Sequence, residues 1–149
     1  MIGTASGTSI SWNDWGCPNF TGNTFCDYMD SCYNTLHNRI GLTWCNNSGQ
    51  AVAAEFTVTT NSVTVVGSDY TWNNNGYQFS RICWDSTNSC YLAAATKSNN
   101  SYYCGLRVMN PGAFSSPPGN QLDVGSSKKP YGLEHDPNAG QTCILYAHT

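Results

Sequence analysis

Eight cysteines in a chain of 149 residues constrain this fold more than any other feature. Their number is even, and their spacing lacks the paired Cys and His motifs that mark a zinc site. An even set without metal spacing predicts up to four disulfides, with the connectivity left open and Cys83 with Cys90 as the expected local pair across a hairpin. Disulfides persist in oxidising compartments, so we expect a secreted, extracellular protein. The expected disulfide cysteines are Cys17, Cys26, Cys32, Cys45, Cys83, Cys90, Cys104 and Cys143.

A single amphipathic helix is predicted at about residues 24–40. Apolar residues recur there at steps of three and four, which places them on one face of a helix. Thr24 can cap its start and Gly41 can end it. The residues of the expected apolar face are Phe25, Met29, Cys32, Tyr33, Leu36 and Ile40.

The rest of the chain predicts antiparallel β-structure. Residues 51–60 alternate apolar and polar side chains, as a half-buried strand does, and residues 63–67 follow as its hairpin partner. Further strands are expected at 77–85, 90–97, 102–110 and 142–149, with loops at 68–76 and 110–130. No internal repeat is evident from the residue pattern. We therefore predict one domain, 1–149, of α+β but mainly β class: an antiparallel sheet or sandwich with one helix, rich in disulfides.

Low charge limits the partners that the surface can bind. Charged residues make up 10% of the chain and the net charge is −3. Nucleic acid and anionic membranes both need many basic contacts, so the composition argues against them. No stretch has the length and apolarity of a membrane span. Three N-glycosylation acceptors, at Asn19, Asn46 and Asn99, are consistent with a secreted glycoprotein.

Aromatic residues interleaved with Asn, Asp and Ser indicate carbohydrate binding. A sugar ring stacks its apolar face on an aromatic ring, while neutral polar side chains bind its hydroxyls. We therefore predict a non-catalytic, lectin-like protein that binds a glycan or cell-surface receptor without cofactor or metal; its oligomeric state is left open. A secreted effector or toxin acting on a host protein, or a structural coat subunit, fits the same features. The candidate ligand-binding residues are Asp69, Tyr70, Trp72, Asn73, Asn74 and Asn75.

An enzyme is the alternative, built from Glu55, Arg81 or Arg107, and His148 on successive expected strands. A glutamate base, an arginine for phosphate charge and a histidine acid suit metal-free cleavage of RNA. This order after a helix resembles the small secreted guanyl-specific ribonucleases of fungi. The resemblance implies a secreted endoribonuclease with Glu55, Arg81 and His148 as catalytic residues.

Glu134, His135 and Asp136 form the densest titratable cluster. Neighbouring carboxylates can tune a histidine for acid–base chemistry or metal binding. An exposed polar turn before Pro137 explains the same triplet.

Overall fold

The computed structural model describes residues 2–6, 9–13, 26–46, 48–59, 62–73, 77–97, 103–112, 114 and 122–148. Within these ranges the protein is all β and contains no helix. Each strand is antiparallel to the strands with which it pairs. The predicted antiparallel, mainly β architecture is therefore confirmed, and the predicted helix is wrong.

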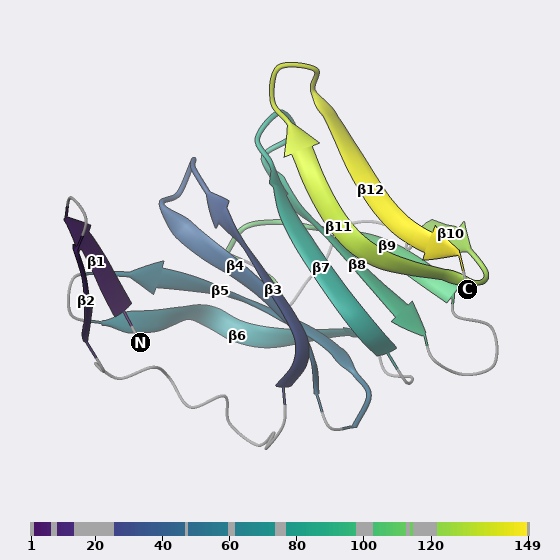
Figure 1. The fold of residues 1–149 in the computed structure, drawn as a ribbon, viewed down its shortest axis with the longest axis horizontal. Helices are drawn as coiled ribbons and strands as arrows, with labels where there is room; N and C mark the ends of the chain where they lie inside the picture. The colour runs from purple at the N-terminus through teal and green to yellow at the C-terminus, as the bar shows by residue number, and fades with distance from the viewer. Residues whose placement is uncertain are drawn as a thin grey trace.

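Two four-stranded sheets and two separate hairpins make up the described structure (Figure 1). The first sheet contains β3 (Cys26–Asn34), β4 (Arg39–Asn46), β5 (Ala51–Val58) and β6 (Val63–Asn73) in that order. The second contains β7 (Tyr77–Asp85), β8 (Cys90–Lys97), β9 (Tyr103–Met109) and β10 (Leu122–Gly125). The two hairpins are β1 (Ile2–Ser6) with β2 (Ser9–Asn13), and β11 (Lys128–Asp136) with β12 (Gln141–His148).

Residues 26–40, predicted as a helix, form β3, a four-residue turn and the start of β4. The pairing of β3 with β4 slips between Asp27 and Asp30, so two residues there have no direct partner. This bulge and the turn shift the alternation of the strands, and the apolar residues then recur at steps that imitate a helix. Their exposure also contradicts a core-facing helix, because Met29, Tyr33 and Leu36 are all exposed.

Two segments predicted as loops are partly strand. β6 continues through Ser68 to Asn73, and β11 covers residues 128–136. These sequences are polar and contain Pro or Gly, so they do not favour a strand on their own. They adopt one here because they pair with neighbouring strands. The strands predicted near 51–60, 77–85, 90–97, 102–110 and 142–149 correspond to β5, β7, β8, β9 and β12.

A repeat of 51 residues, which the residue pattern did not reveal, organises the hairpins β3–β4, β7–β8 and β11–β12. Asn34, Asp85 and Asp136 end the three leading strands at this spacing. Each side chain accepts hydrogen bonds of 2.9–3.2 Å from the backbone N–H groups two and three residues ahead. Each turn then ends in left-handed backbone, with φ of 53° at Asn38, 53° at Ser89 and 64° at Gly140. Internal repeats at such a period are typical of architectures built from one supersecondary unit.

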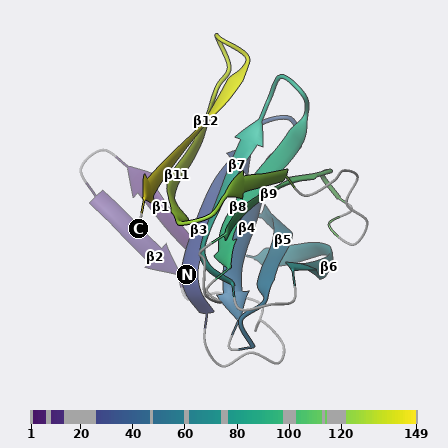
Figure 2. The ribbon, with the colours of Figure 1, turned by 90° about the vertical axis from the view of Figure 1, so that its right-hand side faces the viewer.

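The three leading strands β3, β7 and β11 run in the same direction around a common axis. Contacts advance together along them. Tyr28 meets Phe79, and farther along Asp30 accepts from the Ile82 N–H at 3.0 Å. In the same way Phe79 meets Tyr131, and farther along Asp85 contacts His135. In two views at right angles the three hairpin turns lie at the same end of the molecule (Figures 1 and 2). The protein therefore presents equivalent positions of three hairpins side by side.

The main core lies between the two four-stranded sheets. Trp72, Trp84, Tyr91, Met109 and Phe114 are buried there together with alanines of both sheets. Close approach of the sheets requires Gly41, because a Cβ at this position would lie 2.5 Å from a ring carbon of Tyr91.

Candidate functional site

The two aromatic residues predicted to bind a glycan, Tyr70 and Trp72, do not form an exposed platform. Trp72 is 3% exposed and belongs to the main core, and Tyr70 packs against that core. Arg107 lies over the Tyr70 ring at 5.8 Å and covers it further. Asp69 is exposed. The side chain of Asn73, and Asn74 and Asn75 entirely, lie outside the described residues.

Of the residues of the ribonuclease alternative, Glu55 and Arg81, whose side chains the structure describes, are bound to different partners. Glu55 is fully buried and its carboxylate accepts four hydrogen bonds, from Arg39, Tyr91, Asn34 and the Gly112 N–H, at 2.7–3.3 Å. Four donors occupy the oxygens that a general base would need for a substrate proton. Arg81 donates to the carbonyls of Tyr131 and Ser80 and does not contact this carboxylate. The side chain of His148 lies outside the described residues.

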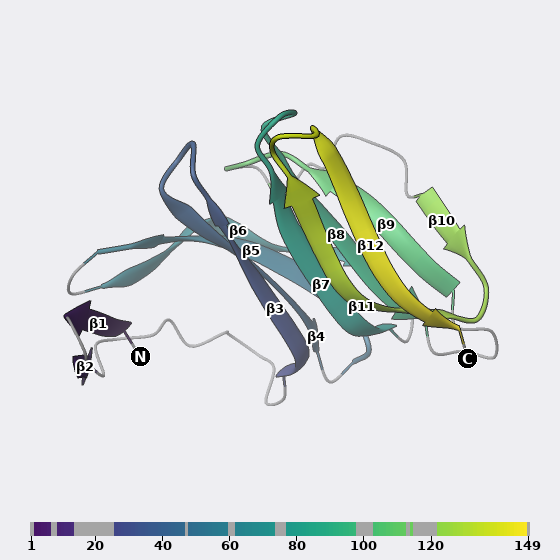
Figure 3. The same ribbon diagram turned by 45° about the horizontal axis from the view of Figure 1, so that its top comes forward.

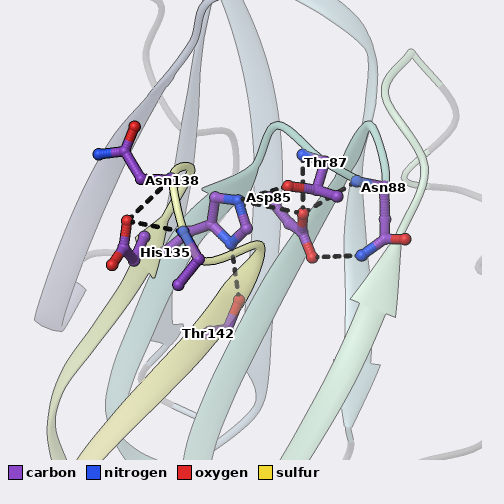
Figure 4. Close-up of polar contacts among 8 residues, drawn as sticks. Asp85, Thr87, Asn88, His135, Asn138 and Thr142 are labelled. Atoms are coloured by element: carbon purple, nitrogen blue, oxygen red, sulfur yellow. Dashed lines mark hydrogen bonds and ion pairs between the residues drawn. The ribbon is translucent and has the colours of Figure 1, made fainter.

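His135 and Asp136 of the predicted titratable cluster bind different partners, and Glu134 is exposed. The side chain of His135 is 4% exposed, and its Nε2 lies 3.4 Å from Asp85 Oδ1 and 3.2 Å from Thr87 Oγ1 (Figure 4). Its Nδ1 lies 3.1 Å from Thr142 Oγ1. Asp136 caps the adjoining turn. The histidine thus fastens β11 to the β7–β8 turn, with both ring nitrogens engaged.

Hydrogen bonds favour the ionised form of Asp85 in its contact with His135. Burial disfavours its carboxylate, but hydrogen bonds from Asn88 and the neighbouring His135 outweigh burial, and the pKa of Asp85 lies below its ordinary value. Asp85 therefore remains ionised where it meets the imidazole.

An aromatic cluster, formed by Tyr28, Phe79 and Tyr131, crosses the three leading strands. Ring centroids are 4.4 Å apart between Tyr28 and Phe79, and 6.2 Å apart between Phe79 and Tyr131. Tyr28 is 42% exposed and Tyr131 is 51% exposed. Phe79 between them is half-buried. Rings of this size are usually buried, so two exposed tyrosines beside a third ring mark a candidate recognition surface.

Each ring of the aromatic cluster stands at a β-bulge. The strand pairings slip at Tyr28, at Phe79 and at Tyr131. Tyr28 and Phe79 have left-handed backbone, with φ of 55° and 58°. Tyr131 follows Pro130, which holds the equivalent position and whose ring fixes a negative φ. Bulges redirect side chains and strained backbone is concentrated at binding sites, so the three bulges together aim these rings at one surface.

Cationic groups border the aromatic cluster. Lys129 Nζ lies 5.1 Å from the centroid of the Phe79 ring, within the range of a cation–π contact. Arg81 is held beside Tyr131 by its hydrogen bond to that residue's carbonyl. The surface therefore combines flat apolar faces, phenol hydroxyls and positive charge.

A pocket of about 250 Å³ lies farther along the same three strands. Cys32, Cys83 and Glu134, which occupy equivalent positions of the three hairpins, line it together with Asp30 and His135. Burial, followed by the nearby acidic groups, raises the pKa of Cys83 to about 12 and shifts the pKa of Cys32 strongly upward. Both thiols are protonated at neutral pH, which disfavours a nucleophilic role.

The predicted disulfides are not present among the cysteines that the structure describes. Cys32, Cys83, Cys90, Cys104 and Cys143 carry free thiols, and Cys45 Sγ lies 3.4 Å from Ser80 Oγ. Cys83 and Cys90 are offset by two residues across their hairpin and do not face each other directly. Cys17 and the side chain of Cys26 lie outside the described residues. Across the described ranges, no group of three or more His, Cys, Asp or Glu side chains is arranged to hold a metal ion.

One sequence signal could have located the aromatic cluster. An aromatic residue, a cysteine, a second aromatic residue and a turn-capping Asn or Asp recur at the same spacing in two of the hairpins. The two segments are Tyr28-x-x-x-Cys32-Tyr-Asn34 and Phe79-x-x-x-Cys83-Trp-Asp85.

Comparison with protein-family models, curated proteins and solved structures found no match. Among the residues described, no helix is long and apolar enough to cross a bilayer.

Proposed function

We propose that this protein is a non-catalytic recognition protein that binds carbohydrate through the aromatic cluster of Tyr28, Phe79 and Tyr131. The observation that carries the proposal is the convergence of three bulges from three repeated hairpins on one row of rings, in which two exposed tyrosines flank the half-buried Phe79. The ligand-binding residues predicted in the 69–75 segment are replaced by this cluster.

Carbohydrate suits the row because its neighbouring rings are tilted relative to one another. Interplanar angles of 40° and 36° present successive faces to a ligand lying across the strands. The apolar C–H faces of successive sugar units can stack on such faces, and phenol hydroxyls and Lys129 can bind the sugar hydroxyls. Neutral stacking with peripheral polar contacts is the chemistry of a lectin.

An extracellular location and disulfide bonds remain part of this proposal. Cys32 and Cys83 are the pair we propose, because they line one pocket from neighbouring strands at equivalent positions. Their oxidation would transfer two electrons and two protons to a small disulfide such as oxidised glutathione, which leaves as two thiols.

Of the three predicted glycosylation acceptors, Asn46 is buried, and its side chain binds Gln50 and the backbone of its own turn. Attachment at Asn46 would therefore have to precede folding.

A glycan array with the labelled full-length protein tests the function. Tyr28→Ala and Tyr131→Ala should each weaken binding to the best glycan by about tenfold, or ~1.4 kcal/mol, through loss of one stacked ring. Tyr33→Ala is the matched control, since Tyr33 is an equally exposed tyrosine of β3 outside the cluster. Binding to a protein receptor with no glycan bound at any concentration would reject the lectin and favour the effector alternative.

A further inference from the structure

β12 exposes side chains at positions that are buried in the other two hairpins. Leu145 is 66% exposed, whereas its equivalents Thr43 and Ala94 are fully buried. Tyr146 is 41% exposed, and its equivalents are buried as well: Trp44 at 1% and Ala95 at 0%. The repeat therefore shows that β12 lacks a cover that β4 and β8 possess.

In the first two sheets, the strands β4 and β8 are each covered by a further pair of strands. β5 pairs along β4 and β9 pairs along β8, and each is followed by one more strand that completes a four-stranded sheet. β12 pairs only with β11 among the strands described. The missing element is thus a two-stranded antiparallel hairpin.

The hairpin β1–β2 has the required form and connectivity. It is two-stranded and antiparallel, and it stands apart from every other sheet (Figures 1 and 3). β6 leads directly into β7 and β10 into β11, so the last strand of each sheet precedes the leading strand of the next. β2 precedes β3 in the same way, which makes β1–β2 the last half of a third sheet.

The arrangement around the axis brings this third sheet next to the first. Cys32 of β3 and Glu134 of β11 line the same pocket, so the third hairpin already faces the first across the axis. Twelve residues separate Asn13 from Cys26, and a chain of that length reaches roughly 40 Å when extended. A connection of that length does not confine the hairpin to the vicinity of β3.

We propose that β1–β2 docks on the free edge of β12 in its own chain, in the order β11-β12-β1-β2, and closes a ring of three equivalent four-stranded sheets. Docking satisfies the edge hydrogen bonds of β12 and buries Leu145 and Tyr146. An unpaired edge with exposed apolar residues would otherwise invite association with other chains. The closed ring joins both ends of the chain to one sheet.

Hydrogen exchange of the full-length protein tests the closure. Amides of residues 141–148 should be protected to within roughly tenfold of those of 90–97, the equivalent strand that β9 covers. Thr4→Pro, which removes a backbone donor from β1 and disrupts its pairing, should raise exchange at 141–148 by roughly a hundredfold and leave 90–97 unchanged. Thr4→Val keeps the backbone N–H and is the matched control.

Three outcomes would overturn the proposal. Exchange at 141–148 in the parent protein as fast as in an unstructured segment would show that the edge is open. Protection that survives Thr4→Pro would show that another segment covers it. Protection that grows with protein concentration, together with a dimer in sedimentation, would assign the edge to the hairpin of a second copy.

Discussion

Tyr28 and Phe79 occupy equivalent positions 51 residues apart, and their rings meet with centroids 4.4 Å from each other. Both residues have left-handed backbone, which is unusual for aromatic side chains and costs about 1–2 kcal/mol at each position. Two strained residues from different sheets therefore form one contact on the surface. The strain and the stacking can be separated experimentally.

Glycine substitution at Tyr28 should separate them. Tyr28→Gly and Tyr28→Ala both remove the ring, but only glycine adopts φ of 55° without steric cost, so Tyr28→Gly should be more stable by about 1 kcal/mol. At Tyr33, whose φ is not positive, the order should reverse by roughly 0.5–1 kcal/mol. Urea denaturation of the four variants gives both differences. An alanine variant at 28 as stable as the glycine variant would contradict the left-handed backbone.

Replacing Glu55 should destabilise the fold instead of abolishing a reaction. Glu55→Ala removes a buried carboxylate and leaves Tyr91, Asn34 and the Gly112 N–H without their acceptor, which should lower the free energy of unfolding by about 3 kcal/mol. Glu134→Gln, at an exposed carboxylate, should change it by less than about 0.5 kcal/mol. A Glu55→Gln protein with unchanged stability that loses an RNA-cleaving activity would restore the ribonuclease hypothesis.

Stability should fall in acid partly because of Asp85. Its folded pKa is lowered, so the unfolded chain takes up this proton first as the pH decreases. The contribution of Asp85 is fully present above its ordinary pKa of 3.8 and is lost as the pH drops through the lower folded value. The difference in unfolding free energy between the parent and Asp85→Asn should therefore shrink below about pH 4. Asn88→Ala removes the hydrogen bond from the Asn88 side chain to Asp85 and keeps the one from its backbone N–H, so it should move this loss to higher pH; an unchanged profile would refute the assignment.

The thiol of Cys83 should be slow to alkylate in the reduced native protein. With a pKa of about 12, its thiolate fraction at neutral pH is small, and iodoacetamide should modify it roughly a hundredfold or more slowly than an ordinary thiol. Cys143, which is exposed, serves as the internal reference. Mass spectrometry of both peptides over time gives the ratio. Equal rates would show that the pocket is open or that the surrounding acidic groups do not act on this thiol.

The sequence predicted strands correctly where apolar and polar side chains alternate along them without interruption. In β5, Phe56 and Glu55 face opposite sides, and the period of two predicted both the strand and its hairpin partner. The same reasoning did not anticipate that Glu55 would also be buried, because the second sheet supplies Tyr91 to bind it. Tertiary packing, which no local pattern contains, changed an expected solvent face into a buried one.

The aromatic cluster could not be predicted from local propensity. A bulge interrupts the alternation at Tyr28 and at Phe79, and positive φ opposes the preference of aromatic residues. Trp72, in contrast, lies in a sequence that suggests an exposed loop but is buried in a continuous strand. The helical pattern near Asn34 failed for a related reason, since the side chain of this residue caps a tight turn that ends β3.

The identical spacing of the turn caps Asn34, Asp85 and Asp136 has a consequence for the history of the chain. Side chains around the caps have diverged, while the geometry of the backbone has been kept. Tandem duplication of one segment, followed by divergence of each copy, would produce this pattern. A synthetic gene encoding three identical copies of that segment would therefore be expected to assemble the same body with true threefold symmetry.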